Sequence, residues 1–326
     1  MRKLILLVGL LLMCTLVSQA QDEPTAYGIA LEKILEAEET GETRLHISGQ
    51  ELSDLPPEIG RLIELESLTI SFSQITALPP EIGNLTNLIN LDLSHNQLTA
   101  LPPEIGNLTN LISLELNSNQ LTELPPEIDN LTNLELLGLN NNQLIALPPE
   151  IGNLNNLEFL GLNGNQLTAL PPEIGNLVNL RDLDLQSNLL TELPPAITNL
   201  ENLRVLNLFD NELQRLPSEL TNLSNLCYLN LNYNQLEEIT SELQNYNGSD
   251  CPDEGAYSLL PSTENTQGTT ALEQYVQIRQ QERERQAIIS VMIGLGGGFL
   301  LSAIVSLFIY WRHGRRGKPK QKRDSL

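Results

Sequence analysis

The chain has 326 residues, of which 40% are hydrophobic and 18% charged, and its formal net charge at pH 7 is −23. The negative charge is concentrated in residues 21–286, which hold nine Lys or Arg against forty Asp or Glu, a net charge of −31. A surface this acidic repels phosphate backbones, so the composition argues against a nucleic-acid-binding function.

Residues 1–20 have the layout of a secretory signal peptide. Arg2 and Lys3 precede an apolar run, residues 4–17, and Ser18 and Ala20 follow it as small residues. We expect cleavage after Ala20. The alternative is a membrane anchor, but a helix of fourteen residues reaches only about 21 Å into a hydrocarbon core of roughly 30 Å. Export is therefore expected, into a compartment that permits disulfides.

Residues 21–42 are predicted to form an N-terminal helical cap. Their sequence places Ile29, Leu31, Ile34 and Leu35 at helical spacing. We expect this apolar face to cover the exposed end of the repeats that follow, because the first layer of a stacked array has no neighbour on its outer side.

Residues 43–243 contain nine units with a strict period of 23 residues. Each typical unit has an LDL or LEL segment, which predicts a short strand, and a PPEI segment, which predicts a short helical turn. One Asn recurs at the same place, at Asn96, Asn119, Asn142, Asn165, Asn188, Asn211 and Asn234. The apolar residues also keep their offsets, as in Leu88, Leu91, Leu93, Leu98, Leu101, Ile105 and Leu108. A single unit buries too little apolar surface to fold alone, so the units must stack.

The pattern LxxLxLxxNxL followed by LPPEIGNL resembles the leucine-rich-repeat family, specifically its 23-residue Ras-suppressor-like type, which is also seen in many bacterial proteins. The resemblance covers residues 43–243. It implies an α/β solenoid, a horseshoe whose concave face is a parallel β-sheet. It also implies that the recurring Asn binds the backbone of neighbouring turns.

Residues 244–286 are predicted to form a C-terminal cap and a stalk. Once the signal peptide is removed, only Cys227 and Cys251 remain. They are 24 residues apart, about one coil of the solenoid, and neighbouring strands lie roughly 4.8 Å apart. This spacing favours a disulfide over two unpaired thiols, which is the alternative.

Residues 287–311 carry no charge and are long enough for one transmembrane helix. Residues 312–326 form a basic tail with seven Lys or Arg against one Asp, which predicts a cytoplasmic C-terminus and an extracytoplasmic N-terminus at the cell membrane. Small residues recur at every fourth position of the helix, at Ser290, Gly294, Gly298, Ser302 and Ser306. This spacing favours a homodimer through the helix. The alternative is the ordinary Gly and Ser content of a spanning helix.

Two groups of residues on the expected concave face are candidate protein-binding sites. A central group has Leu136 and Phe159 beside Gly138 and Gly161, and a C-terminal group consists of Val205, Phe209, Tyr228 and Tyr233. Exposed apolar and aromatic side chains with a polar rim are candidate contacts for a protein or cell-surface ligand. The alternatives are neutral variation within the repeat, or shielding of the two tyrosines by the C-terminal cap.

The sequence contains no metal-spaced Cys–His pair and no glycine-rich phosphate loop, so we expect no enzyme, no metal site and no cofactor. The Glu that recurs in the PPEI segments is interpreted as solvated surface, with a calcium site as the alternative. The predicted function is a non-catalytic protein-binding or adhesion ectodomain anchored in the membrane. The alternative function is a signalling co-receptor that acts through a membrane partner.

Overall fold

The computed structural model describes residues 25–49 and 51–237. The chain divides into two units, Met1–Ala256 and Tyr257–Leu326, and the described residues all lie in the first. The predicted signal peptide, stalk, transmembrane helix and basic tail fall outside the described residues and stay predictions. Within the described part, no helix combines the length and the apolar character needed to cross a membrane.

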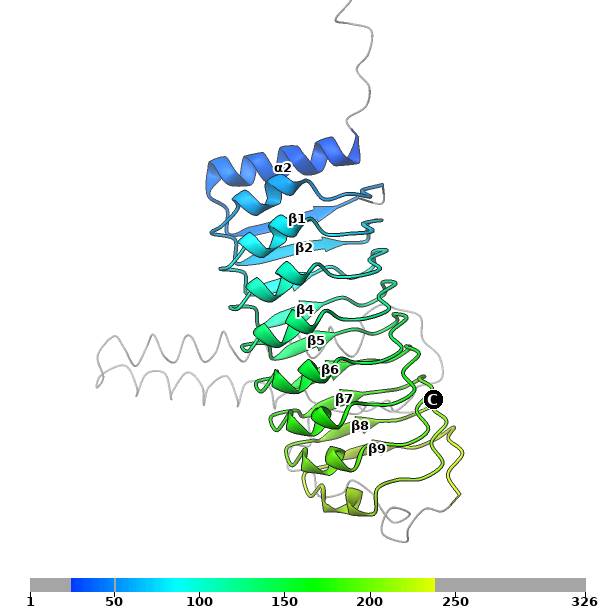
Figure 1. The fold of residues 1–326 in the computed structure, drawn as a ribbon. Helices are drawn as coiled ribbons and strands as arrows, with labels where there is room; N and C mark the ends of the chain where they lie inside the picture. Colours follow the sequence, from blue (N-terminus) through cyan, green and yellow to red (C-terminus); the bar gives the residue numbers. More distant parts are fainter. Residues whose placement is uncertain (1–24, 50, 238–326) are drawn as a thin grey trace, which may run out of the picture. The chain divides into compact units, whose positions relative to one another are not determined.

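Nine strands form one parallel sheet, in which each strand pairs with the next strand along the chain (Figure 1). The strands are β1 (Arg44–Ser48), β2 (Ser67–Ser71), β3 (Asn90–Asp92), β4 (Ser113–Glu115), β5 (Leu136–Gly138), β6 (Phe159–Gly161), β7 (Asp182–Asp184), β8 (Val205–Asn207) and β9 (Tyr228–Asn230). The register follows the sequence period, because each residue pairs with the residue 23 positions later, as Leu91 does with Leu114. The nine predicted repeats are therefore confirmed as nine stacked coils.

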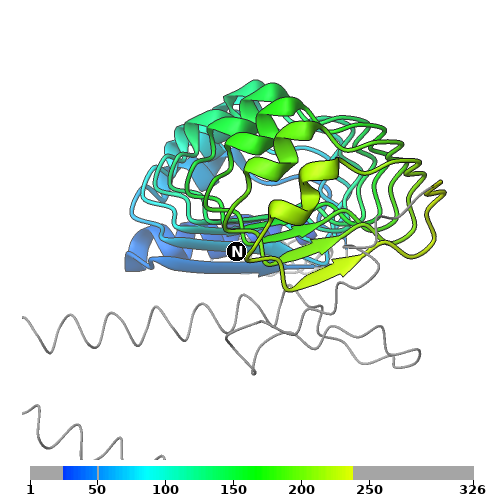
Figure 2. The ribbon, with the colours of Figure 1, turned by 90° about the horizontal axis from the view of Figure 1, so that it is seen from below.

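Each of the first eight coils continues from its strand into a short 3₁₀ helix. These helices are η1 (Pro57–Arg61), η2 (Pro80–Asn84), η3 (Pro103–Asn107), η4 (Pro126–Asn130), η5 (Pro149–Asn153), η6 (Pro172–Asn176), η7 (Pro195–Asn199) and η8 (Ser218–Asn222). In η1 to η7 a proline stands at the start, where its missing N–H costs no hydrogen bond. Seen along the stack, the strands form one side of each coil and the 3₁₀ helices form the opposite side (Figure 2).

The hydrophobic core lies between the sheet and the helices and runs through every coil. Leu91 and Leu93 reach it from strand β3 and the residue after it, and Ile105 reaches it from η3; each is at most 1% exposed. Because every coil supplies the same apolar residues, each layer of the core is covered by the layers before and after it. The predicted shared core is confirmed.

The N-terminal cap is helix α2 (Ala26–Thr40), which lies across the first coil (Figure 1). The Thr25 hydroxyl caps its start by accepting a hydrogen bond from the Gly28 N–H at 3.1 Å. The helix was predicted correctly, and its buried face in part: of the four predicted apolar residues, Ile34 is buried and Leu31 half-buried. Ile29 and Leu35 are each 42% exposed, whereas the inner face consists of two alanines around one fully buried residue, Ile34. The small alanine side chains let the helix pack closely against the first coil, which bulkier residues would prevent.

At the other end of the described region, Cys227 precedes strand β9 and is disulfide-bonded. Its predicted partner, Cys251, lies outside the described residues, so that pairing stays a prediction.

Candidate binding surface

The side chains that point away from the core along β1 to β9 form one surface, which we call the strand face. It is the face that the sequence predicts to be concave. The pairing of the strands places Leu136 beside Phe159, Phe159 beside Asp182, and Asp182 beside Val205. Val205 in turn pairs with Tyr228. Leu136 and Phe159 of the central group therefore share one row with Val205 and Tyr228 of the C-terminal group, and Asp182 interrupts this row on β7.

This row is more deeply buried than the sequence suggested. Leu136 is 6% exposed, Phe159 9% and Val205 7%, so these side chains are not the exposed contacts that we expected. Part of the reason is the position of the Phe159 ring: its Cε1 lies only 3.0 Å from where a Cβ would stand on Gly161. The absence of a side chain at Gly161 thus lets the Phe159 ring lie against its own strand. The row therefore presents a flat apolar surface that protrudes little.

The C-terminal end of the strand face is more open. Tyr233 is 75% exposed, and its ring packs against Phe209 at a centroid distance of 4.9 Å with the rings tilted by 59°. Tyr228 is half-buried, and its hydroxyl accepts a hydrogen bond from Nδ2 of Asn230 at 3.1 Å. Within the predicted sites, only this end therefore keeps a largely exposed aromatic side chain.

Amide side chains connect neighbouring coils beside the apolar row. Oδ1 of Asn117 accepts a hydrogen bond from the N–H of Asn140 at 2.9 Å, and Oδ1 of Asn140 accepts one from the N–H of Asn163 at 2.8 Å. The Asn140 amide also lies over Gly161, where a Cβ would approach it to 2.8 Å. These bonds fix the amide groups, so the polar side of the row is rigid.

Asp184 lies on the same face and holds its carboxyl in a partly desolvated position. Burial raises the pKa of this carboxyl above its ordinary value, and hydrogen bonds from the backbone of Gln186 and the side chains of Asn207 and Asn163 partly offset the effect. The Gln186 N–H donates to Oδ1 of Asp184 at 3.2 Å. The hydrogen bonds stabilise the charged form of Asp184, which burial disfavours.

An aromatic pair near the N-terminal end was not predicted from the sequence. The rings of Phe72 and His95 stack with their centroids 4.3 Å apart and their planes 11° from parallel. Phe72 is 63% exposed. Both residues occupy the first turn after a strand, and their 23-residue spacing, visible in the sequence, was the signal that could have predicted the contact.

Two columns of asparagine run along the solenoid, and only one was predicted. The buried asparagine column contains the recurring Asn of the sequence pattern; Asn142, for example, donates from Nδ2 to the carbonyls of Leu116 and Leu139, both at 3.0 Å. The predicted role of this column is confirmed. The exposed asparagine column consists of Asn87, Asn110, Asn133, Asn156, Asn179, Asn202 and Asn225. Each of its members donates to the carbonyl of the residue 24 positions earlier, as Asn133 does to Thr109 at 2.9 Å.

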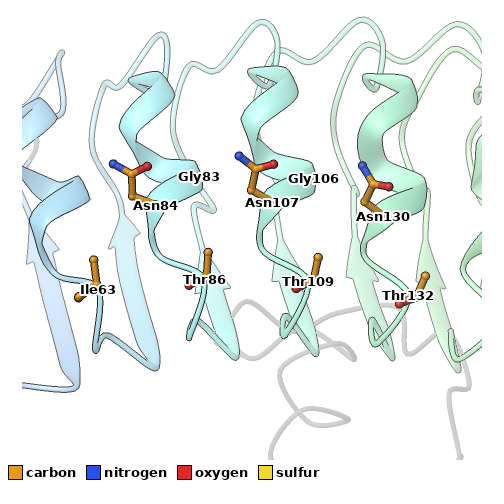
Figure 3. Close-up of a pocket in the computed structure, with 9 residues that line it drawn as sticks. All are labelled: Ile63, Gly83, Asn84, Thr86, Gly106, Asn107, Thr109, Asn130 and Thr132. Atoms are coloured by element: carbon orange, nitrogen blue, oxygen red, sulfur yellow. The ribbon is translucent and has the colours of Figure 1, made fainter.

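A shallow groove of about 800 Å³ lies beside the exposed asparagine column. Asn84, Asn107 and Asn130 line one side of it, and a parallel row of threonines lines the other (Figure 3). Stacking here is close, because a Cβ on Gly83 would stand 2.6 Å from the carbonyl oxygen of Glu104. The asparagines occupy one position of the 23-residue repeat and the threonines another, with Ile63 at the threonine position of the first coil. The groove therefore follows from the repeat, and it does not combine acidic, basic or nucleophilic side chains as a catalytic site would.

The recurring Glu of the PPEI segments is only partly solvated, in contrast to the prediction. It is half-buried in η1 and in η3 to η6, and it is exposed in η2 and in η8, where Glu219 holds the equivalent place. Over residues 25–49 and 51–237, no three His, Cys, Asp or Glu side chains come together as metal ligands could.

Comparison with known families identifies the repeats. Residues 44–120 match the description "Leucine-rich repeat region", residues 155–213 and 178–236 match "Leucine rich repeat", and residues 110–131 match a further leucine-rich-repeat description. The comparison with curated proteins finds no match.

Several solved structures share the fold. A leucine-rich-repeat protein of Leptospira interrogans is 40% identical with a TM-score of 0.59, and the alignment covers 61% of this chain and 57% of that one. The functional domain of InlJ from Listeria monocytogenes is 27% identical, with a TM-score of 0.53 and coverage of 61% and 41%. The plant peptide hormone receptor RGFR1, solved in complex with RGF2, is 33% identical, with a TM-score of 0.53 and coverage of 59% and 32%.

The chain thus spans little more than half of the Leptospira protein and less of the other two. The matches and the nine parallel coils agree on the architecture, including its occurrence in bacterial proteins. The chain belongs to the leucine-rich-repeat family.

Proposed function

We propose that this protein is a non-catalytic protein-binding or adhesion ectodomain anchored in the cell membrane. The observation that carries the proposal is the apolar row Leu136, Phe159, Val205 and Tyr228, which crosses neighbouring strands of the strand face. The hydrogen-bonded amide groups of Asn117 and Asn140 flank this row. A flat apolar surface with a fixed polar rim suits the core of a protein interface.

The structural relatives support a protein ligand. RGFR1 was solved in complex with RGF2, and the ectodomain of the Arabidopsis thaliana receptor kinase GASSHO1/SCHENGEN3, 32% identical with a TM-score of 0.50, was solved with CASPARIAN STRIP INTEGRITY FACTOR 2. These ligands belong to those proteins. They support a binding role for the solenoid of this chain, because in these relatives the same architecture is found with a bound partner.

Capture of partners by the full-length chain, solubilised in mild detergent, tests the proposal. The bait is incubated with envelope fractions of the source cells, beside a Leu136→Ser, Phe159→Ser variant. Serine is a suitable replacement because Ser113 holds the equivalent place on the neighbouring strand β4. We expect the variant to lose at least one partner that the unchanged protein captures.

The matched control is Val178→Ser, which removes an apolar side chain of comparable type that is 49% exposed and follows the 3₁₀ helix η6. If the control and the double variant lose the same partners, the strand face is not the binding surface. Circular dichroism verifies that all three proteins are folded.

The proposal includes a transmembrane helix at residues 287–311 with the solenoid outside the cell. It also includes a homodimer formed through Ser290, Gly294, Gly298, Ser302 and Ser306. Small residues at this spacing allow two helices to approach closely, so Gly294→Ile with Gly298→Ile is expected to abolish dimers in a cross-linking assay. Protection of the basic tail from protease on intact cells tests the orientation.

The same stripe of small residues also suits a signalling co-receptor, which would pair with the helix of a different membrane protein. Under that alternative, the helix variant abolishes a cellular response but leaves capture by the solenoid unchanged. Under the adhesion proposal, the strand-face variant is the one that abolishes function.

A further inference from the structure

Phe72 and His95, which we call the rim stack, form a flat aromatic column at the edge of the strand face. Their rings are 4.3 Å apart and nearly parallel, close to the roughly 4.8 Å between neighbouring strands. The backbone holds the column in place, because the His95 N–H donates to the carbonyl of Asn117 at 2.8 Å. In the preceding coil the same place is occupied by Gly49, which has no side chain, and Phe72 is left 63% exposed.

Both residues of the rim stack have a backbone conformation that most side chains avoid. Phe72 has φ 54° and His95 has φ 57°, both in the left-handed region. The equivalent places in the next five coils hold Ser118, Asn141, Gly164, Ser187 and Asp210, and the last described coil has Tyr233. Histidine is among the residues that tolerate this conformation, whereas a bulky phenylalanine is a poor choice for it. Because Phe72 is also mostly exposed, burial does not compensate for it, so neither local conformation nor core packing accounts for an aromatic residue here.

We infer that the rim stack is a docking point for an arginine side chain of a protein partner. The face of an aromatic ring attracts a cation, and the planar guanidinium group of arginine can stack on it, which the compact ammonium group of lysine cannot. The surroundings favour a basic partner, since residues 21–286 carry a net charge of −31. Asp92, three residues before His95, supplies a carboxylate on the adjoining strand, held by the Ser94 N–H at 2.9 Å. The inference rests on the proposed protein-binding function and names the chemistry of one contact.

A random peptide library displayed on phage is the probe. It is selected on the full-length chain in detergent micelles and counter-selected on a Phe72→Ser, His95→Ser variant. Ser118 and Ser187 show that serine fits this backbone conformation, so the variant is expected to fold. Tyr27→Ser is the matched control, because it removes an aromatic side chain that is 41% exposed from the cap helix α2, outside the strand face.

We expect the selected peptides to share an arginine. A synthetic peptide from this set should bind the Phe72→Ser, His95→Ser variant about twofold to fivefold more weakly, the size of an exposed cation–π contact. Replacing its arginine by lysine or by neutral citrulline should weaken binding to the unchanged protein but have little further effect on that variant. The Tyr27→Ser control should bind like the unchanged protein.

The inference is wrong if the library shows no preference for arginine, or if arginine peptides bind the Phe72→Ser, His95→Ser variant as tightly as the unchanged protein. Equal binding of the lysine analogue would also overturn it, because charge alone would then account for the affinity. If peptides are selected and lose affinity only in the Leu136→Ser, Phe159→Ser variant, the proposed function is supported while the rim stack is excluded as the docking point.

Discussion

The buried and the exposed asparagine columns use the same residue type at the same 23-residue period, yet their surroundings differ. Asn142 in the buried column is 6% exposed, and besides donating to two carbonyls it accepts a hydrogen bond from the N–H of Leu121 at 3.0 Å. Asn133 in the exposed column makes one bond, to the carbonyl of Thr109, in contact with solvent. Periodicity therefore shows that a residue recurs, but burial decides how much its hydrogen bonds matter.

The largest expected effect is for Asn142→Ala. It leaves the N–H of Leu121 without a partner in a site closed to water. It also removes one of the two hydrogen bonds that each of the carbonyls of Leu116 and Leu139 accepts, the other coming from Asn119 or Asn165. An unsatisfied buried donor costs about 1 to 3 kcal/mol and each lost hydrogen bond about 0.5 to 1.5 kcal/mol, partly relieved by relaxation, so we expect a loss of about 3 kcal/mol. Urea denaturation followed by circular dichroism measures it. A loss below about 1 kcal/mol would contradict the importance of the buried column.

A much smaller effect is expected for Asn133→Ala in the exposed column. Water can replace the lost donor at the Thr109 carbonyl, so the free energy of unfolding should fall by about 0.5 kcal/mol, and by less than about 1 kcal/mol. The same denaturation experiment applies, with Asn142→Ala measured beside it. Equal losses in the two variants would remove the distinction between the columns.

The smallest effect is expected where an amide replaces a carboxyl, in Asp184→Asn. Burial raises the folded-state pKa of Asp184, so the charged form is disfavoured in the folded protein. The destabilisation is full above that folded pKa and disappears as the pH falls below 3.8, the ordinary pKa of an aspartate in the unfolded chain. The variant should therefore be slightly more stable than the unchanged protein at pH 7, and this advantage should vanish near pH 3.

Asparagine is expected to fit at position 184, because Asn207 holds the equivalent place on the neighbouring strand β8. Thermal unfolding of both proteins at several pH values measures the difference. A gain in stability that does not change with pH would show that desolvation of the carboxylate is not its cause.

Much of the fold could be predicted because the repeat leaves few alternatives. The strand and turn segments recur nine times, so the register, the core residues and the buried asparagine column followed from the period. The cap helix was predicted from its apolar spacing, and Ile34 is buried as predicted, but Ile29 and Leu35 are exposed. Two faces of α2 carry apolar residues, and only the shape of the first coil selects the one with Ala30, Ile34 and Ala37.

The candidate site was predicted less well, since exposure depends on neighbouring coils. The pattern identified Leu136 and Phe159 as unusual residues of the strand face, but it could not show that the Phe159 ring lies against Gly161. It did not identify Phe72 and His95, because a contact between residues 23 apart exists only once two coils are stacked.

The sequence by itself determined the number of coils, the pairing of the strands and the identity of the core, because a strict period allows only one way to bury nine sets of leucines. The tertiary structure alone decided which recurring side chains are closed off from water, which face of α2 packs inward and which aromatic rings meet. Those properties depend on distances across the stack, and the order of residues along one coil does not contain them.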